Sequence, residues 1–585
     1  MRSLIDETGI PGVSIAIIDH GKIAFSGTYG FKTAKVNADS RTVFEACSLS
    51  KTFLVYVAHK LADAGKLDFD RPLFEYLAEQ RLVHDERNKS ITARMVLCHS
   101  SGIENWQSMN NPDTLEILST PGKRFIYSGE GYNYLAEVIS LILNKDYKTY
   151  IDEIVLNPLQ LKNTFITFSE DGKSPNDYAV GHNALGLPID KMKNTEPDPA
   201  SGINTTATDY AKLIVAIFSG SNLSEKRVSD IKNPVIRLNE NDPNSYYGPG
   251  FAIVYSGKDT IIYQGGDNEG YKACVLYSTV SKTGLVLMTN SDRGLTMVQK
   301  LNELSVNINI KSFIEKADPN KQYPSEVSTL LRTYRQGGLE KMAQKLEVLK
   351  SSKKMQEHTL DELSYSFLQT NPELSVKLLQ ENILLNPQDA TAYYLMGIIS
   401  LEMKDYYSAK EYFTKSRELN FPDLDYNNSI ELFLKKCELA INDIETRNTY
   451  ITNISANDKT NIQAEGYNKM EGITIGVSND IDSTRDVRNL DEGDWLSYKV
   501  NVTQPGLYKI SLRVRNGQQP ADIELQSETK SLTKINIPGN AGNVRQWQTL
   551  TAEAELLPGT QMLKLNVQHG GIRINWFEFS KSNPN

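Results

Sequence analysis

The residue pattern of this 585-residue chain changes character twice, so one fold cannot accommodate all of it. Up to about residue 315, strand-like runs stand on both sides of helical sequence. From 323 to 445 the chain is rich in Leu, Lys and Glu, and from 455 to 582 apolar and polar residues alternate. We therefore predict a multidomain protein: an α/β domain at 1–315, an α-helical repeat domain at 323–445 and an all-β sandwich at 455–582.

The first segment has strand patterns at both of its ends. Two strands are predicted at 13–18 and 22–27, before a helix from about 48 to 64 whose apolar residues recur every four positions. Further strands are predicted at 250–255, 260–264, 271–277 and 285–289. This order predicts one antiparallel sheet flanked by helices and completed by the two ends of the domain.

The middle segment carries a helix pair with regularly spaced apolar and small residues. Residues 392–419 resemble a tetratricopeptide repeat, which they match at Tyr393, Gly397, Tyr406, Ala409 and Phe413. A degenerate earlier copy begins at about residue 354. We expect stacked helix hairpins that bury their apolar faces on one another. Such repeats either brace the flanking domains, the interpretation that we favour, or bind peptides.

The third segment alternates apolar and polar residues in short runs. These runs lie at 495–502, 506–514, 523–525, 562–567 and 572–579. Pro-Gly pairs at 505–506, 538–539 and 558–559 separate several of them. The pattern is typical of an antiparallel β-sandwich.

Composition excludes two classes of partner. The net charge is -9 and no basic stripe is present, which argues against nucleic-acid binding. No apolar run reaches the roughly 18 residues that a membrane helix needs, so no membrane span is predicted. No charged region followed by an apolar run opens the chain, so no signal peptide is visible and the native N-terminus stays open.

The four cysteines are scattered, and none forms a C-x-x-C pair of the kind that binds zinc or does redox chemistry. A disulfide between Cys47 and Cys274 and a set of buried free thiols both stay open, and we favour the thiols.

The pattern Cys47-Ser48-Leu49-Ser50-Lys51 places a hydroxyl and an amine at helical spacing. A serine hydroxyl is a weak nucleophile and needs a base beside it. Residues i and i+3 share one face of a helix, so Lys51 can reach Ser48. A desolvated lysine loses its proton more easily, and a serine at a helix N-terminus has a backbone N–H free to hold an oxyanion. The pattern alone occurs often by chance.

Two later motifs give this pattern its context. Tyr127 lies in Phe-Ile-Tyr-Ser-Gly-Glu-Gly-Tyr-Asn at 125–133, and Tyr-Gln-Gly-Gly-Asp-Asn-Glu-Gly-Tyr follows at 263–271 on a predicted strand. With these motifs, residues 5–312 resemble the serine β-lactamase and penicillin-binding-protein superfamily, most closely its class C and esterase-like branch. The first segment is therefore expected to have the α/β fold of that superfamily.

The resemblance implies a role for each matching residue. Ser48 matches the serine that is acylated and Lys51 its partner, and Tyr127 matches the tyrosine that relays protons to the leaving group. On the strand that also holds Gln264 and Gly266, Asp267 is the residue whose backbone N–H would complete the oxyanion hole. No cofactor is expected for catalysis.

Two positions depart from the family pattern. The tyrosine motif usually ends in Asn where this chain has Gly129, and the strand motif usually starts with Lys or His where this chain has Gln264. In relatives both groups help to hold a carboxylate or a β-lactam. We therefore expect cleavage of a peptide or an ester rather than efficient β-lactam hydrolysis.

Three other patterns carry no catalytic assignment. Lys282-Thr283-Gly284 spells a penicillin-binding signature, but it lies in the predicted turn before the last strand. His99 is expected to pack or to bond a turn. Neither a G-x-S-x-G elbow nor an H-E-x-x-H zinc motif occurs in the sequence.

The third segment resembles a family 6 carbohydrate-binding module. The likeness rests on the motifs at 462–467, 492–498 and 575–577. It implies a structural calcium near Gln463 and Glu465, although a solvated carboxylate is an equal alternative for Glu465. The positions matching the family's sugar cleft are Asn489, Val544 and Arg573, and none keeps the family's residue, so weak binding of neutral glycans is expected. Trp495, Trp547 and Trp576 are expected in the core.

Together these patterns predict an extracytoplasmic serine hydrolase that forms an acyl-enzyme at Ser48. Its expected substrate is a D-amino-acid peptide, as for a D,D-carboxypeptidase or a D-aminopeptidase, or an ester, and a cell-wall origin would suit it. Contacts to a glycan or a protein are expected through the C-terminal modules. The alternative is a catalytically weak scaffold that binds muropeptide or protein partners.

Overall fold

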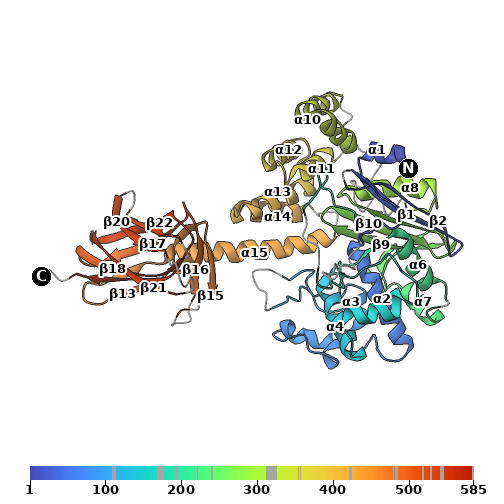
Figure 1. Cartoon of the computed structure of the whole chain (residues 1–585), viewed down its shortest axis with the longest axis horizontal. Helices are drawn as coiled ribbons and strands as arrows, with labels where there is room; N and C mark the ends of the chain where they lie inside the picture. Colours follow the sequence, from blue (N-terminus) through green and yellow to red (C-terminus); the bar gives the residue numbers. More distant parts are fainter. Residues whose placement is uncertain are drawn as a thin grey trace. The chain divides into compact units, whose positions relative to one another are not determined.

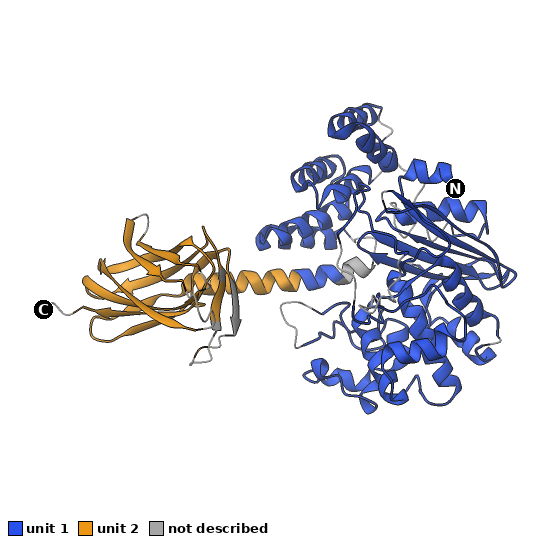
Figure 2. Ribbon diagram, viewed as in Figure 1, with its two compact units in different colours: residues 1–433 blue, residues 434–585 orange. Residues whose placement is uncertain are grey.

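The computed structural model describes most of the chain. Outside the described residues lie 34, 108–113, 168–176, 191–194, 221, 239–241, 311–325, 353–354, 356–357, 420–423, 478–479, 481–484, 517–518, 528–529, 540–545 and 583–585. The contacts divide the chain into two compact units, residues 1–433 and 434–585 (Figure 2). The helical segment thus shares a unit with the first segment, and the predicted domain boundaries stay predictions.

The first unit is built on an antiparallel sheet in the order β3-β2-β1-β11-β10-β9-β8-β7-β6. β1 (Gly12–Asp19) pairs with β11 (Gly284–Thr289), which confirms a sheet completed by both ends of the domain. The other strands are β2 (Lys22–Thr33), β3 (Val36–Asn37), β6 (Ile236–Arg237), β7 (Ser245–Tyr247), β8 (Ala252–Ser256), β9 (Asp259–Asn268) and β10 (Tyr271–Ser278); β4 (Phe44–Glu45) and β5 (Asn204–Thr205) form a separate pair.

Helices cover both faces of this sheet (Figure 1). Alternate residues of β1 point to opposite sides: Ala16 and Ile18 join the core under α2, α4 and α6, whereas Val13 and Ile15 pack with α1 and α8. This alternation follows from the two-residue period of a strand. The helices are α1 (Arg2–Thr8), α2 (Lys51–Asp63), α3 (Ala93–Leu97), α4 (Gly129–Leu143), α5 (Tyr147–Ile151), α6 (Ala207–Phe218), α7 (Glu225–Ile231) and α8 (Val298–Leu304).

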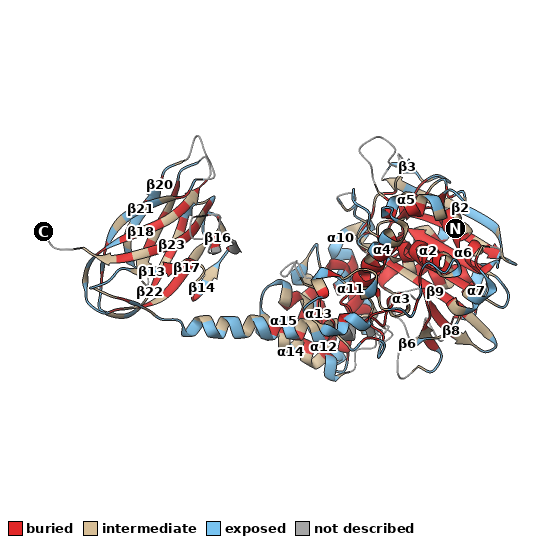
Figure 3. Cartoon of the chain, turned by 90° about the horizontal axis from the view of Figure 1, so that it is seen from below, coloured by how far each residue is buried: buried red, intermediate tan, exposed pale blue. Residues whose placement is uncertain are grey.

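The helix predicted from residue 48 begins later than expected. A 3₁₀ turn spans Cys47–Ser50, and α2 starts at Lys51. Cys47 has a φ of 53°, in the left-handed region, so the chain turns sharply before the helix. From there α2 is buried along nearly its whole length (Figure 3). Ser48 therefore lies on a tight turn that a central helix holds in place.

The helical segment forms consecutive antiparallel pairs. Its helices are α10 (Glu326–Ser351), which Gly338 with a φ of 76° divides into two helical parts, α11 (Thr359–Phe367), α12 (Pro372–Leu385), α13 (Ala390–Glu402) and α14 (Tyr406–Glu418). At the α13–α14 contact, Gly397 lies so close to Phe413 that an added Cβ would be 2.7 Å from its ring. The small residue is needed for this close approach. The hairpins match the expected spacing, and their assignment to tetratricopeptide repeats stays a prediction.

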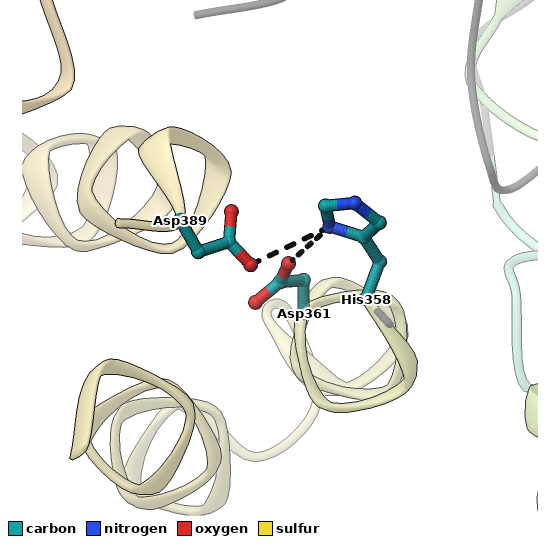
Figure 4. A group of neighbouring side chains, drawn as sticks. All are labelled: His358, Asp361 and Asp389. Atoms are coloured by element: carbon teal, nitrogen blue, oxygen red, sulfur yellow. Dashed lines mark hydrogen bonds and ion pairs between the residues drawn. The ribbon is translucent and has the colours of Figure 1, made fainter. Parts of the chain in front are cut away.

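A buried polar group joins these hairpins (Figure 4). His358 Nδ1 lies 3.1 Å from a carboxylate oxygen of Asp361 and 3.4 Å from one of Asp389, the N-cap of α13. Asn382 of α12 donates to both carboxylates. These hydrogen bonds raise the pKa of His358 from 6.5 to about 10, first of all the bond to Asp361, so the imidazole is a cation between two carboxyl groups at neutral pH.

We expect His358→Gln to lower the stability of this segment by about 1.5–3 kcal/mol, the cost of losing a charge-assisted hydrogen bond. Because the folded pKa lies above the ordinary value, the contribution is complete below about pH 6.5 and is lost as the pH rises through about 10. Hydrogen exchange of residues 359–418 at pH 6 and pH 10 measures it. His20→Gln, at a side chain that is 87% exposed, is the control. Equal protection in the two variants at pH 6 would contradict the expectation.

The second unit contains two mainly antiparallel sheets, which confirm the predicted sandwich. One has the order β12-β17-β22-β19-β20 with β14 on β17, and the other β15-β16-β23-β18-β21 with β13 on β23. α15 (Leu424–Thr449) precedes strands β12 (Thr452–Ile454), β13 (Thr460–Gln463), β14 (Lys469–Glu471), β15 (Thr474–Val477), β16 (Arg485–Leu490), β17 (Trp495–Val502), β18 (Gly506–Asn516), β19 (Ala521–Ser527), β20 (Lys530–Ile537), β21 (Gln548–Leu556), β22 (Gly559–His569) and β23 (Ile572–Lys581).

Two of the three tryptophans expected in this core lie elsewhere. Trp547 is buried, but Trp495 and Trp576 are half-buried. The strand period puts each on the face opposite its buried neighbour, Leu496 or Phe577. On that outer face the Trp495 indole donates a 2.6 Å hydrogen bond to a carboxylate and lies under a lysine. The core prediction is therefore wrong for these two residues.

The four cysteines are free and buried, which confirms the thiol interpretation and leaves Cys47 and Cys274 unlinked. Among the described helices, none is both long and apolar enough to span a membrane.

Candidate active site

Ser48 is the partly exposed residue of an otherwise buried turn. Its neighbours Cys47, Leu49 and Ser50 are buried, and Ser50 Oγ accepts a 3.0 Å hydrogen bond from the backbone N–H of Ile203. The turn is thus fixed from inside while Ser48 itself stays partly exposed. This placement suits a nucleophile, which needs both a fixed position and access to substrate.

Lys51 lies in the first turn of α2 with its side chain directed at Ser48. Its Nζ donates to Ser48 Oγ at 3.3 Å and to the carbonyl oxygen of Ala200 at 2.9 Å. The residue is 2% exposed. Burial lowers the pKa of Lys51 from 10.5 to about 7, against the opposing effect of the Asp198 carboxylate. A neutral amine is therefore available near neutral pH, as a general base requires.

Tyr127 stands beside this lysine. The Lys51 Nζ lies 4.8 Å from the centre of the Tyr127 ring, and the rings of Tyr132 and Trp106 lie at 5.6 and 5.8 Å. Apart from its two hydrogen-bond partners, the amine thus lies among aromatic rings rather than among other polar groups. The structure brings together Ser48, Lys51 and Tyr127, the three residues predicted to be catalytic.

His99 packs against the Tyr127 ring. Its imidazole stacks on the Tyr127 ring with 4.1 Å between centroids, and its Nδ1 accepts a 3.1 Å hydrogen bond from the backbone N–H of Ser128. Burial, helped by the nearby Lys51 charge, holds the pKa of His99 well below its usual 6.5. His99 is a neutral packing residue, as expected from the sequence.

The strand β9 passes closely against the Ser48 turn. A Cβ added at Gly266 would lie 2.8 Å from the carbonyl oxygen of Ala46 and 3.0 Å from Cys47 Cβ, so this close approach requires glycine. Next in the strand, the Asp267 carboxylate is exposed and pairs with Lys272 Nζ at 2.7 Å. The oxyanion role predicted for Asp267 concerns its backbone N–H, and it stays a prediction.

Gln264 and Gly129 have different surroundings. The Gln264 side chain is buried: its Oε1 accepts a 2.6 Å hydrogen bond from Tyr247, and its Nε2 donates to the Gly265 carbonyl at 3.0 Å. Both of its polar ends are thus bonded within the protein. Gly129 begins α4 and lies directly under the Trp106 ring. Their roles as substrate-binding residues stay predictions.

Sequence reasoning missed Ala200, Asp198 and Trp106. The first two lie about 150 residues after Lys51, in a loop without a motif, so no local pattern could connect them with it. A signal for Trp106 was present, because it is the only tryptophan before residue 495.

The Lys282-Thr283-Gly284 sequence lies at the other end of β10. The Ser48 turn meets the first residue of this strand, since Cys47 Sγ is 3.6 Å from the Tyr271 carbonyl oxygen. The remainder of the strand separates that end from the Lys282 turn, which has a φ of 57°. Seven strand steps span roughly 23 Å. The turn assignment therefore holds, and this lysine cannot reach Ser48.

In the second unit, Gln463 ends β13 and offers an oxygen that would suit calcium. Its Oε1 is buried and has no hydrogen-bond partner among the residues that the structure describes. Calcium favours carbonyl and carboxylate oxygens, and Glu465 follows two residues later. Of the predicted sugar-cleft positions, the side chains of Asn489 and Val544 lie outside the described residues, and Arg573 lies 3.8 Å from the Asp486 carboxylate.

Two family models match the chain. The Beta-lactamase model matches residues 1–309, and the model of the carbohydrate binding module (family 6) matches residues 463–581. Among curated relatives, Protein flp of Staphylococcus aureus (strain MW2) is 25% identical over 349 residues, covering 56% of this chain and 66% of its own. Beta-lactamase-like protein 4 of Dictyostelium discoideum is 24% identical over 328 residues, covering 49% and 57%. The chain thus spans less than two thirds of the length of either relative.

The solved structures that are similar to this chain align with half of its residues. The octameric penicillin-binding protein homologue from Pyrococcus abyssi has 22% identity and a TM-score of 0.42, over 50% of this chain and 72% of that one. D-alanine carboxypeptidase AmpC from Burkholderia cenocepacia has 18% identity and a TM-score of 0.43, over 50% and 91%. Since the Beta-lactamase model covers more than half of the residues, the chain belongs to the beta-lactamase family.

Proposed function

We propose that this protein is a serine acyl-transfer hydrolase in which Lys51 activates Ser48. The observation that carries the proposal is the position of Lys51 Nζ, 3.3 Å from Ser48 Oγ and buried so that its pKa falls to about 7. A structural lysine would keep its charge and pair with a carboxylate. This one gains a serine hydroxyl and a carbonyl oxygen as partners instead.

The proposed reaction has two stages. Ser48 Oγ bonds to the substrate's carbonyl carbon as its proton passes to Lys51 Nζ, and the backbone N–H groups of Ser48 and Asp267 hold the oxyanion. The bond to the leaving group then breaks, and that group takes a proton by way of Tyr127. In the second stage water attacks the acyl-enzyme, the acyl group leaves as an acid, and Ser48 regains its proton.

The proposed substrate is a D-amino-acid peptide, cleaved as by a D,D-carboxypeptidase or a D-aminopeptidase, or an ester. The departures at Gly129 and Gln264 support this choice over a β-lactam, because Gly129 offers no side chain and Gln264 is bonded to Tyr247. Rates on D-alanyl peptides, nitrophenyl esters and nitrocefin test it. Turnover of nitrocefin far above that of every peptide and ester would contradict it.

The alternative function is a catalytically weak scaffold that binds muropeptide or protein partners. A fluorophosphonate probe separates the two, because it labels a serine only where a base activates it. We expect stoichiometric labelling at Ser48. An intact wild-type protein that resists the probe at every pH would favour the scaffold.

We expect Tyr127→Phe to lower turnover by about 10²-fold, the usual effect of losing an acid–base group. The Phe ring keeps the stacking on His99 and the contact with Lys51, so only the hydroxyl is lost. Steady-state kinetics of the two proteins measure the effect. Tyr132→Phe is the matched control, since the Tyr132 hydroxyl donates to the Leu97 carbonyl instead. A loss that is as large in the control would assign the effect to packing.

For the second unit we propose contact with a glycan or a protein in an extracytoplasmic setting, with a structural calcium held by Gln463 and Glu465. The buried Gln463 Oε1 supports the calcium, which would fix the loop after β13. Calcium titration followed by thermal unfolding tests it. We expect a rise in the unfolding temperature that Gln463→Leu removes. The same rise in the variant would overturn the site.

A further inference from the structure

We propose that Trp106 is a specificity-determining residue of the Ser48 site and selects substrates with an uncharged, apolar group next to the scissile bond. The proposal rests on the proposed hydrolase function and extends it to the chemistry of the substrate. It starts from a contact between Trp106 and Gly129, one of the two positions where the chain departs from the pattern of its family.

The indole of Trp106 fills the space that a side chain at position 129 would need. A Cβ added at Gly129 would lie 2.6 Å from Trp106 Cη2 and 2.7 Å from Cζ3, shorter than any real contact of a Cβ. The ring and a side chain at 129 therefore exclude each other. An aromatic surface here takes the place of a polar amide.

The backbone on both sides of Trp106 is held by the start of α4. The backbone N–H of Gly129 donates to Asn105 Oδ1 at 2.9 Å and to the Asn105 carbonyl oxygen at 3.0 Å. The backbone N–H of Gln107 donates to the Glu130 carboxylate at 3.3 Å, and Arg81 bonds the same carboxylate. These bonds fix the backbone from which the Trp106 indole projects.

Trp106 is also open to a ligand. It is 46% exposed although its ring centre lies 5.8 Å from Lys51 Nζ, the proposed base. A large apolar side chain at the surface beside a reaction centre is a contact surface for an apolar group. Removing that group from water would favour binding by up to about fourfold for each methylene.

Lys51, the ammonium group beside Ser48, offers no charge to a substrate carboxylate in the active form of the site, because it acts as a base only when it is neutral. Lys272 of β10 is bonded to Asp267 at 2.7 Å and to Asp292 at 3.0 Å. Its side chain lies on the face of the sheet opposite Ala273, whereas Ala273 packs in the same core as Leu49. An uncharged group against Trp106 needs neither cation.

Alkyl fluorophosphonates test this without knowledge of the natural substrate. A bond forms between Ser48 Oγ and phosphorus, fluoride leaves, and the serine proton passes to Lys51. Second-order rate constants are measured for probes with two-carbon and eight-carbon alkyl groups. We expect Trp106→Ala to slow the eight-carbon probe about tenfold or more and the two-carbon probe less than threefold. Trp106→Phe, which keeps an aromatic ring, should retain most of the preference for the longer probe.

Gly129→Ala supplies an independent arm. The added Cβ must displace the indole, so we expect it to reduce the preference as Trp106→Ala does and to add nothing in the double variant. Phe25→Ala is the matched control: Phe25 is 47% exposed and lies on β2, which β1, β11 and β10 separate from β9. It should leave both rate constants unchanged.

The outcomes separate this proposal from the hydrolase itself. A wild-type protein labelled at Ser48, in which Trp106→Ala leaves the ratio of the two rate constants unchanged, would overturn the role of Trp106 and leave the hydrolase intact. A wild-type protein that neither probe labels would overturn both. Additive losses for Trp106→Ala and Gly129→Ala would show that Gly129 does not act through the indole.

Discussion

Replacing Ser48 by alanine is expected to lower turnover by about 10³-fold or more on every substrate that the parent cleaves. The hydroxyl oxygen forms the acyl bond, and loss of a covalent nucleophile removes several orders of magnitude in rate. The fold should survive, because Ser48 is the partly exposed residue of its turn and its neighbours Leu49 and Ser50 make the buried contacts. Kinetics measures the loss of turnover, and mass spectrometry after incubation with a fluorophosphonate measures the accompanying loss of labelling.

Ser50→Ala is the matched control for this experiment. It removes the hydrogen bond to the backbone N–H of Ile203 inside the same turn, at a cost of about 1 kcal/mol in stability. It leaves the Ser48 hydroxyl in place, so labelling should persist. A Ser48→Ala protein that kept near wild-type activity would show that another residue is the nucleophile.

The sheet of the first unit could be predicted because its strands carry their own signals. β1, β10 and β11 are short apolar runs bounded by turn residues, and each appeared within one or two residues of its expected place. Their pairing followed from the rule that one sheet must bury all of them. The start of α2 was displaced because periodicity cannot reveal a positive φ at a cysteine, which costs energy and is set by tertiary contacts.

The site could be predicted only where local spacing brings groups together. Ser48 and Lys51 are three residues apart, so a helical turn is enough to bring them close. The Ala200 carbonyl that holds Lys51 is 149 residues away and comes from an irregular loop. Likewise, whether Trp495 points outward depends on which face of β17 packs against the other sheet. The alternation of apolar and polar residues does not decide this, because a shift of one residue exchanges the two faces.

The second large effect is expected at Lys51. Lys51→Arg keeps a positive charge but replaces a group that can lose its proton by one that stays protonated at all ordinary pH values. As the general base, Lys51 must be neutral to take the serine proton, so we expect turnover to fall by about 10²- to 10⁴-fold. Burial lowers the pKa of Lys51 to about 7, so the neutral form predominates above that pH. In the wild type, kcat/KM should therefore rise tenfold per pH unit below 7 and level off above it.

The Asp198 carboxylate provides a test of this pH dependence, because removing its charge should shift the pKa of Lys51 in a known direction. Its carboxylate raises the pKa of Lys51 against the larger effect of burial, so removing the charge should lower that pKa further and move the rising limb toward acid. Asp198→Asn keeps an oxygen for the backbone N–H of Ala200, which Asp198 Oδ1 accepts at 2.9 Å. The kcat/KM profile of the variant measures the shift. A limb that stays in place would assign the pH dependence to a group other than Lys51, and a shift toward higher pH would contradict the pKa-raising effect given to the Asp198 carboxylate.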